Sequence, residues 1–222
     1  MVTDSTVVSG SAPFAHRNMK NCFKAAGRFW VFTSNGTDGV YYTSQDGITW
    51  SSATVFRTGI VEWYDFSLWY RGTFFVYACT PEPETTLYVR RGTPNVDGTI
   101  TWSAAEQSAV SEGGGVEYNN IYVALDTSNI IWVSYLRVSG GVSVPTVSKS
   151  GNTDGTWGSA PAGFPFTLNA DGSGIKLVPT SAGKIVVIYN TTSGSTRVRV
   201  RRYSGSWSAE LSSAYSPLSI AV

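Results

Sequence analysis

The chain has 222 residues, which is enough for one large all-β domain or two small ones. Aromatic residues and charged residues each make up 14% of it, and this balance excludes a disordered chain, which has few aromatics and many charges. The net charge of +1 argues against a general binder of nucleic acids or anionic membranes. The longest clearly apolar run, Ile185 to Ile188, is too short to span a bilayer.

Pairs of strands recur along the chain, each an apolar segment followed by an alternating one. The apolar segments are 29–32, 74–77, 131–134 and 185–188, and the alternating segments are 40–43, 87–90, 144–147 and 198–201. A further strand and a tight turn precede each pair. These turns carry Gly27, Gly72, Ser128-Asn129 and Gly183, and Gly and Asn tolerate the positive φ of hairpin turns. The unit is therefore four short antiparallel strands in roughly 50 residues, which describes one propeller blade.

This recurrence predicts an all-β fold, a small β-propeller of about four four-stranded blades. A β-sandwich also has many short strands with regular turns, but it does not explain why the same unit returns. A β-solenoid is the third alternative. We expect a single domain over residues 1–222, with repeats at about 15–58, 59–112, 113–169 and 170–215 and terminal arms at 1–14 and 216–222.

A tryptophan closes a short turn in every repeat. The turns run from Ser44 to Trp50, Asn95 to Trp102, Asn152 to Trp157 and Ser204 to Trp207. They resemble the Asp box of sialidase-like propellers (the bacterial neuraminidase repeat), Ser/Thr-x-Asp-x-Gly-x-Thr-Trp. The first copy lacks one residue between Asp and Gly, and the fourth copy has lost its Asp.

The resemblance implies a structural role for the box residues, away from any catalytic face. They are Asp46, Gly47, Trp50, Asp97, Gly98, Trp102, Asp154, Gly155, Trp157 and Trp207. The carboxylate can accept backbone N–H bonds across its own turn, and the Trp can pack between sheets and satisfy its indole N–H there. We expect no metal ion, because no second carboxylate lies nearby at loop spacing.

Catalysis is the less favoured hypothesis. The catalytic sialidases that share this box are similar to six-bladed propellers and carry an Arg-Ile-Pro motif, which this chain lacks. Glu62, Asp65 and Glu117 stand where the innermost strands begin, and two carboxylates facing one cleft could hydrolyse a glycosidic bond. Glu62 and Glu117, however, hold similar places in successive repeats, which indicates inherited structure. His16 is the single histidine, so ordinary His-dependent catalysis depends on that residue.

The starts of the innermost strands face the channel mouth of a propeller, where ligands usually bind. The candidate ligand-binding residues there are His16, Arg17, Glu62, Trp63, Asp65, Glu117 and Tyr118. Trp63 is the leading one, because aromatic faces stack on sugar rings and also anchor protein interfaces.

We therefore expect a non-enzymatic binding or structural module that presents blade loops to a glycan or a protein. The alternatives are a surface component of a virion or appendage and a minimal sialidase-like glycoside hydrolase. We expect no cofactor, no nucleic-acid partner and no membrane span. The location expected is extracellular or on a virion surface, without a visible signal peptide. The apolar residues 218–222 suggest a homo-oligomer or a larger assembly.

Overall fold

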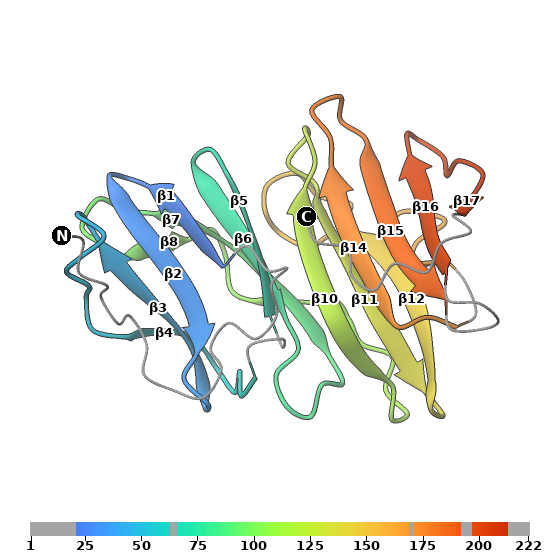
Figure 1. Cartoon of the computed structure of the whole chain (residues 1–222), viewed down its shortest axis with the longest axis horizontal. Helices are drawn as coiled ribbons and strands as arrows, with labels where there is room; N and C mark the ends of the chain where they lie inside the picture. Colours follow the sequence, from blue (N-terminus) through green and yellow to red (C-terminus); the bar gives the residue numbers. More distant parts are fainter. Residues whose placement is uncertain (1–20, 63–65, 169–170, 192–196, 213–222) are drawn as a thin grey trace.

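The computed structural model of the chain describes residues 21–62, 66–168, 171–191 and 197–212, and its regular elements are all β-strands (Figure 1). They form four antiparallel sheets, each from one stretch of chain. The first holds β1 (Cys22–Ala25), β2 (Arg28–Ser34), β3 (Asp38–Ser44) and β4 (Thr54–Thr58). The second holds β5 (Phe66–Arg71), β6 (Phe74–Cys79), β7 (Leu87–Pro94) and β8 (Ile100–Trp102), with β9 (Gln107–Val110) also paired to β7.

The third sheet holds β10 (Glu117–Leu125), β11 (Ile131–Ser139), β12 (Val142–Lys149) and β13 (Phe166–Thr167). The fourth holds β14 (Gly174–Pro179), β15 (Ile185–Thr191), β16 (Arg197–Tyr203) and β17 (Leu211–Ser212). The structure therefore confirms the predicted all-β fold of about four four-stranded blades. The repeat limits stay a prediction, and the expected arms at 1–14 and 216–222 lie outside the described residues.

Local chain chemistry explains the hairpins that open each sheet. Gly27, Gly72, Asn129 and Gly183 have φ values of 74°, 66°, 63° and 73° in these turns, as the sequence predicted. A residue with positive φ is needed there because the primed turns match the twist of the two flanking strands.

The apolar core is divided among the boundaries between successive sheets. Trp30 and Phe75 belong to the cluster between the first and second sheets, and Tyr135 to the one between the second and third. Trp132 and Tyr189 belong to the cluster between the third and fourth sheets. Each sheet is thus held by its sequence neighbours, which keeps the four sheets side by side in chain order (Figure 1).

Candidate active site at the crossover end

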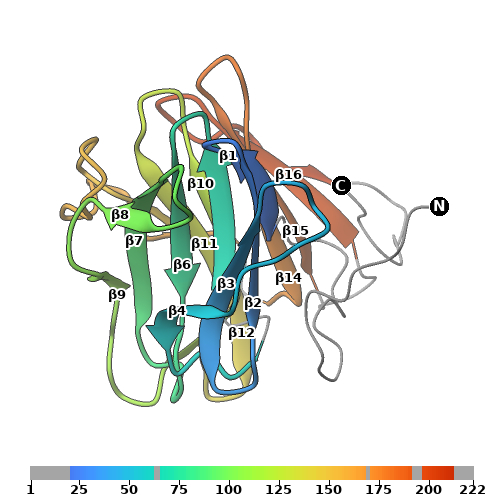
Figure 2. The same cartoon turned by 90° about the vertical axis from the view of Figure 1, so that its left-hand side faces the viewer.

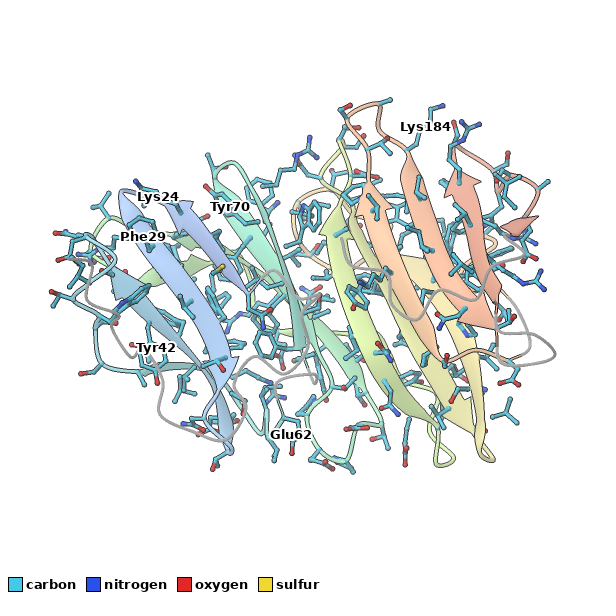
Figure 3. The ribbon with its side chains drawn as sticks, in the orientation of Figure 1. Lys24, Phe29, Tyr42, Glu62, Tyr70 and Lys184 are labelled. Carbon is cyan, nitrogen blue, oxygen red and sulfur yellow. The ribbon has the colours of Figure 1, made fainter. Side chains whose placement is uncertain are left out.

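The first strands of the four sheets run in the same direction. The hairpins that leave them gather at the upper end in Figure 1, and the segments that lead from one sheet to the next gather at the lower end. We call these the hairpin end and the crossover end. Figure 3 labels Lys24 and Lys184 at the hairpin end and Glu62 at the crossover end.

The two ends differ in charge in the described chain, although Asp46, Asp97, Asp126 and Asp154 also lie at the hairpin end. The carboxylates at the crossover end are Asp38, Glu62, Glu82, Glu84, Glu112, Glu117 and Asp171. The cations at the hairpin end are Lys24, Arg28, Arg71, Arg91, Lys149 and Lys184. Arg57 and Arg137, on the strand halves nearer the crossover end, each pair with a carboxylate, Glu106 and Glu112. Among the described residues, carboxylates therefore outnumber cations at the crossover end.

The best-defined part of this end lies between the second and third sheets. The Glu84 backbone oxygen accepts a bond from the Tyr118 N–H at 3.0 Å, so the β6–β7 loop is tied to the start of β10. In the amide orientation that lets the Asn119 side-chain nitrogen donate, this nitrogen lies 2.6 Å from Glu84 Oε2. The loop thereby holds the Glu84 carboxylate beside the strand that carries Glu117.

Two residues of this region have backbone conformations that non-glycine residues rarely adopt. Glu84 has φ 56° and Asn120 has φ 55°, and the pairing of β10 with β11 shifts between Asn119 and Tyr122. Such conformations cost on the order of 1–3 kcal/mol each and cluster at functional sites, and β-bulges often re-aim a side chain next to an active site. The irregular backbone and the carboxylates thus coincide at one place.

The structure places the two predicted carboxylates that it describes at this end, both exposed. Glu117 is the first residue of β10, opposite Val138, so a rigid sheet positions it. Glu62 lies in the segment before β5, and the Ser34 hydroxyl lies 2.7 Å from the carbonyl oxygens of both Ile60 and Val61, so that it can donate to either. Both side chains are therefore accessible to a ligand and carried by anchored backbone.

The other predicted ligand contacts fare differently. Tyr118 is fully buried, its hydroxyl accepts the Glu112 N–H at 3.0 Å, and its ring packs edge-on against Tyr135. It belongs to the core, so the expectation that it contacts a ligand is wrong. His16, Arg17, Trp63 and Asp65 lie outside the described residues. The sequence analysis missed Glu84 and Asn119, and the one available signal was the pair of carboxylates that flank Pro83.

The aspartates of the Trp turns lie at the hairpin end and bond within their own turns. Asp46 Oδ1 accepts the N–H groups of Ile48 and Thr49 at 2.8 Å each. These bonds and the Ser44 hydroxyl lower the pKa of Asp46 to about 2, the Thr49 N–H contributing most. Asp97 and Asp154 accept the N–H of Thr99 and of Thr156 at 2.9 and 2.8 Å, and hydrogen bonds from these threonines lower both pKa values.

The glycines of these turns have the positive φ that the turns require, whereas the tryptophans differ in how they pack. Gly47, Gly98 and Gly155 have φ values of 76°, 90° and 91°, which a side chain would strain. Trp102, Trp157 and Trp207 pack against the cores between sheets, whereas Trp50 is half-buried and outside these cores. The indole N–H of Trp207 is buried without a hydrogen-bond partner, so packing between the sheets does not supply it with an acceptor.

The described residues offer neither a metal-binding cluster nor a membrane-spanning helix. No group of three or more His, Cys, Asp and Glu side chains in that part of the chain is arranged to hold a metal ion. Nor does any described helix have the length and apolarity to cross a membrane.

Comparison with known proteins finds similarity in structure. Neither a protein-family model nor a curated protein sequence matches the chain. An endo-1,4-beta-xylanase from Bacteroides thetaiotaomicron matches with a TM-score of 0.52 at 14% identity, over 89% of this chain and 72% of that one. An exo-beta-1,3-galactanase from Phanerochaete chrysosporium matches at 0.51 and 14%, over 92% and 53%. An ulvan lyase matches at 0.53 and 14%, over 82% and 51%.

These similarities show the fold and correct the expected function. At 14% identity these similarities support the propeller architecture alone. None of the three proteins is named a sialidase, so the sialidase-specific part of the resemblance gains no support. All three bear the names of carbohydrate-active enzymes. The expectation of a non-enzymatic module is therefore wrong, and the alternative of a minimal glycoside hydrolase is the better supported one.

Proposed function

We propose that this chain is a carbohydrate-active enzyme, a small glycoside hydrolase with its active site at the crossover end. The observation that carries the proposal is the acidic crossover end, where exposed Glu62 and Glu117 accompany the strained Glu84 loop. The fold supports it, since the neighbours with this architecture include a xylanase and a galactanase. A glycan is accordingly the partner that we assign to the chain.

Glycoside hydrolysis needs two carboxyl groups with different protonation states. One donates a proton to the leaving glycosidic oxygen, and the other either activates a water molecule or attacks the anomeric carbon. We assign these two roles to Glu117 and Glu62, because both are exposed and lie on anchored backbone at the same end. Glu84, oriented by the Asn119 amide, is the positioning carboxylate beside Glu117.

The experiment measures reducing ends released from xylan, β-1,3-galactan and arabinan by the purified chain. We expect activity on at least one polymer and a loss of roughly 10²–10⁴-fold in Glu117→Gln and Glu62→Gln, as for a removed acid or base. Glu82→Gln is the matched control, because Glu82 is exposed at the same end but has no assigned role.

The ulvan lyase among the fold neighbours supplies the competing chemistry. Ulvan is therefore included in the panel, and a lyase would release unsaturated ends that absorb ultraviolet light, with no water consumed. Unsaturated products, activity on none of the four polymers, or full activity in Glu117→Gln would each overturn the proposal.

A further inference from the structure

A groove of about 690 Å³ runs along the outer boundary between the second and third sheets. One wall comes from β9 and the residues after it, and the other from β12, β13 and the turn at Trp157. Figure 2 shows β8 and β9 at the outer side of the second sheet. This volume lies within the range of sites that bind small molecules.

The groove occupies a place that the second and fourth sheets fill with charged side chains. In β7, Arg90 faces the preceding sheet next to Tyr77, whose hydroxyl donates to Glu106 at 2.6 Å. In β16, Arg199 lies opposite Tyr189, and both contact Glu210.

In the third sheet the corresponding residues are small. Thr146 stands on β12 opposite Tyr135, the register position of Arg90 and Arg199, and Ala160 follows Trp157 at the spacing at which Glu210 follows Trp207. Ser148 stands opposite Val133, where the second sheet has Gly92. All three small residues line the groove. The groove therefore exists because the third sheet lacks the arginine and glutamate that close the same boundary elsewhere.

This exchange leaves buried hydroxyl groups without partners. Tyr135 is fully buried and Ser148 is 1% exposed, yet neither hydroxyl has a hydrogen-bond partner. A buried polar group left unpaired costs about 1–3 kcal/mol, so each such group calls for an explanation. Ser148 lines the groove, and Thr146 and Thr167 add further hydroxyls on the same sheet face.

Trp157 is also left uncovered. Trp102 carries the Arg90 guanidinium 4.4 Å from its ring centroid, and Trp207 stacks on Phe166 at 4.8 Å. Trp157 lines the groove and packs on the core between the second and third sheets, but no described ring or cation covers it. Its turn is held firmly, since the Ser150 hydroxyl donates to the Thr156 carbonyl and accepts the Gly158 N–H.

The charge of the groove selects the class of ligand. Its only charged lining residues in the described chain are Glu112 and Arg137. These two neutralise each other, because Arg137 Nε and Nη2 lie 2.9 and 2.7 Å from the two Glu112 oxygens. A groove of hydroxyls with one aromatic ring and no unpaired charge suits a neutral sugar chain.

We propose that this groove is an accessory binding site for a neutral polysaccharide chain, with a sugar ring on Trp157 and sugar hydroxyls bonded to Ser148. The inference rests on the proposed function for the glycan class, and it adds a second site to the active site. Glu112 belongs to the crossover end, so a chain bound in the groove points toward Glu117.

The test is isothermal titration calorimetry of the Glu117→Gln chain, which prevents turnover, with xylohexaose and β-1,3-galactotriose. We expect at least one of them to bind, and Trp157→Ala to weaken binding about tenfold or more. Ser148→Ala should weaken it roughly three- to tenfold, the equivalent of one hydrogen bond. The matched control is Ser134→Ala, because Ser134 is also buried without a partner but does not line the groove. It should leave affinity unchanged.

The serine pair keeps the test decisive if Trp157→Ala does not fold. Three results would each overturn the proposed binding site. They are no binding of either oligosaccharide, equal losses of affinity in Ser148→Ala and Ser134→Ala, and tighter binding of a galacturonic acid oligomer. Ser148-dependent binding in a chain whose wild type hydrolyses no polymer would uphold the groove and refute the proposed function, so the two failures are distinguishable.

Discussion

The Glu106 carboxylate joins the first sheet to the second, and its removal should destabilise the fold markedly. Arg57 of β4 lies 2.8 Å from one Glu106 oxygen, and the Tyr77 hydroxyl of β6 donates to the other at 2.6 Å. The side chains of Arg57 and Glu106 are only 23% and 17% exposed. Glu106→Ala therefore leaves a guanidinium and a hydroxyl largely buried without their acceptor.

The size of the effect follows from these contacts. An unsatisfied buried group costs about 1–3 kcal/mol, and breaking a buried ion pair costs about 3–5 kcal/mol. Because the cluster is not fully buried, we expect a loss of about 3 kcal/mol in the free energy of unfolding. At about 2–4 °C per kcal/mol for a chain of this size, the melting temperature should fall by roughly 6–12 °C. Glu106→Gln keeps one acceptor and should lose about half as much.

Urea unfolding monitored by tryptophan fluorescence measures this difference. Glu112→Ala is the control, since Glu112 and Arg137 form a well-aligned pair that is 39% and 32% exposed. Exposed pairs contribute about 0–1 kcal/mol, so the control should lose little. A loss below about 1 kcal/mol in Glu106→Ala, or equal losses in both variants, would refute the reasoning that burial gives this cluster its strength.

Two further predictions concern the first sheet. The folded pKa of Asp46, about 2, lies below its ordinary value of 3.8, so the stability from this carboxylate is full above about pH 4 and is lost as the pH falls toward 2. Asp46→Ala should thus be less stable than wild type at neutral pH and converge with it near pH 2, and urea titrations at several pH values measure this; a constant gap contradicts it. In Gly39→Ala the new Cβ would lie 2.6 Å from the buried Phe56 ring, so we expect a loss of about 1–3 kcal/mol by thermal unfolding. Gly36→Ala is the control for steric contact, because no heavy atom lies within 4 Å of the added Cβ. The φ of +90° at Gly36 adds backbone strain to this control.

The fold was predictable because its signals are local. The glycines and Asn129 of the opening hairpins and the strand pairs between them recur in each repeat, and a short strand needs only its own turn to find its partner. The site was less predictable because it depends on loops. Glu84 meets Asn119 only through a positive φ at Glu84 and a bulge in β10, and neither has a sequence pattern.

Strand periodicity alone could have removed one wrong site residue. Glu117 and Tyr118 are consecutive on β10, and consecutive side chains of a strand point to opposite faces. Only one of them could face a ligand, and the structure exposes Glu117 and buries Tyr118. A polar residue beside an aromatic one at the start of an inner strand therefore indicates one surface residue and one core residue.

The repetition of a carboxylate in successive repeats also misled the prediction, because a repeated residue can serve structure or function depending on where it lies in the fold. The similar places of Glu62 and Glu117 argued for inherited structure, yet in this fold equivalent positions of neighbouring repeats gather at one end of the molecule. Repeat symmetry thus places carboxylates at the same end, which is compatible with catalysis. Where one repeat departs from the others, the departure is informative in its own right. The third repeat keeps Trp157 but has Thr146 at the register position of Arg90 and Arg199. It also has Ala160 at the position of Glu210, and these small residues turn a closed boundary into a groove.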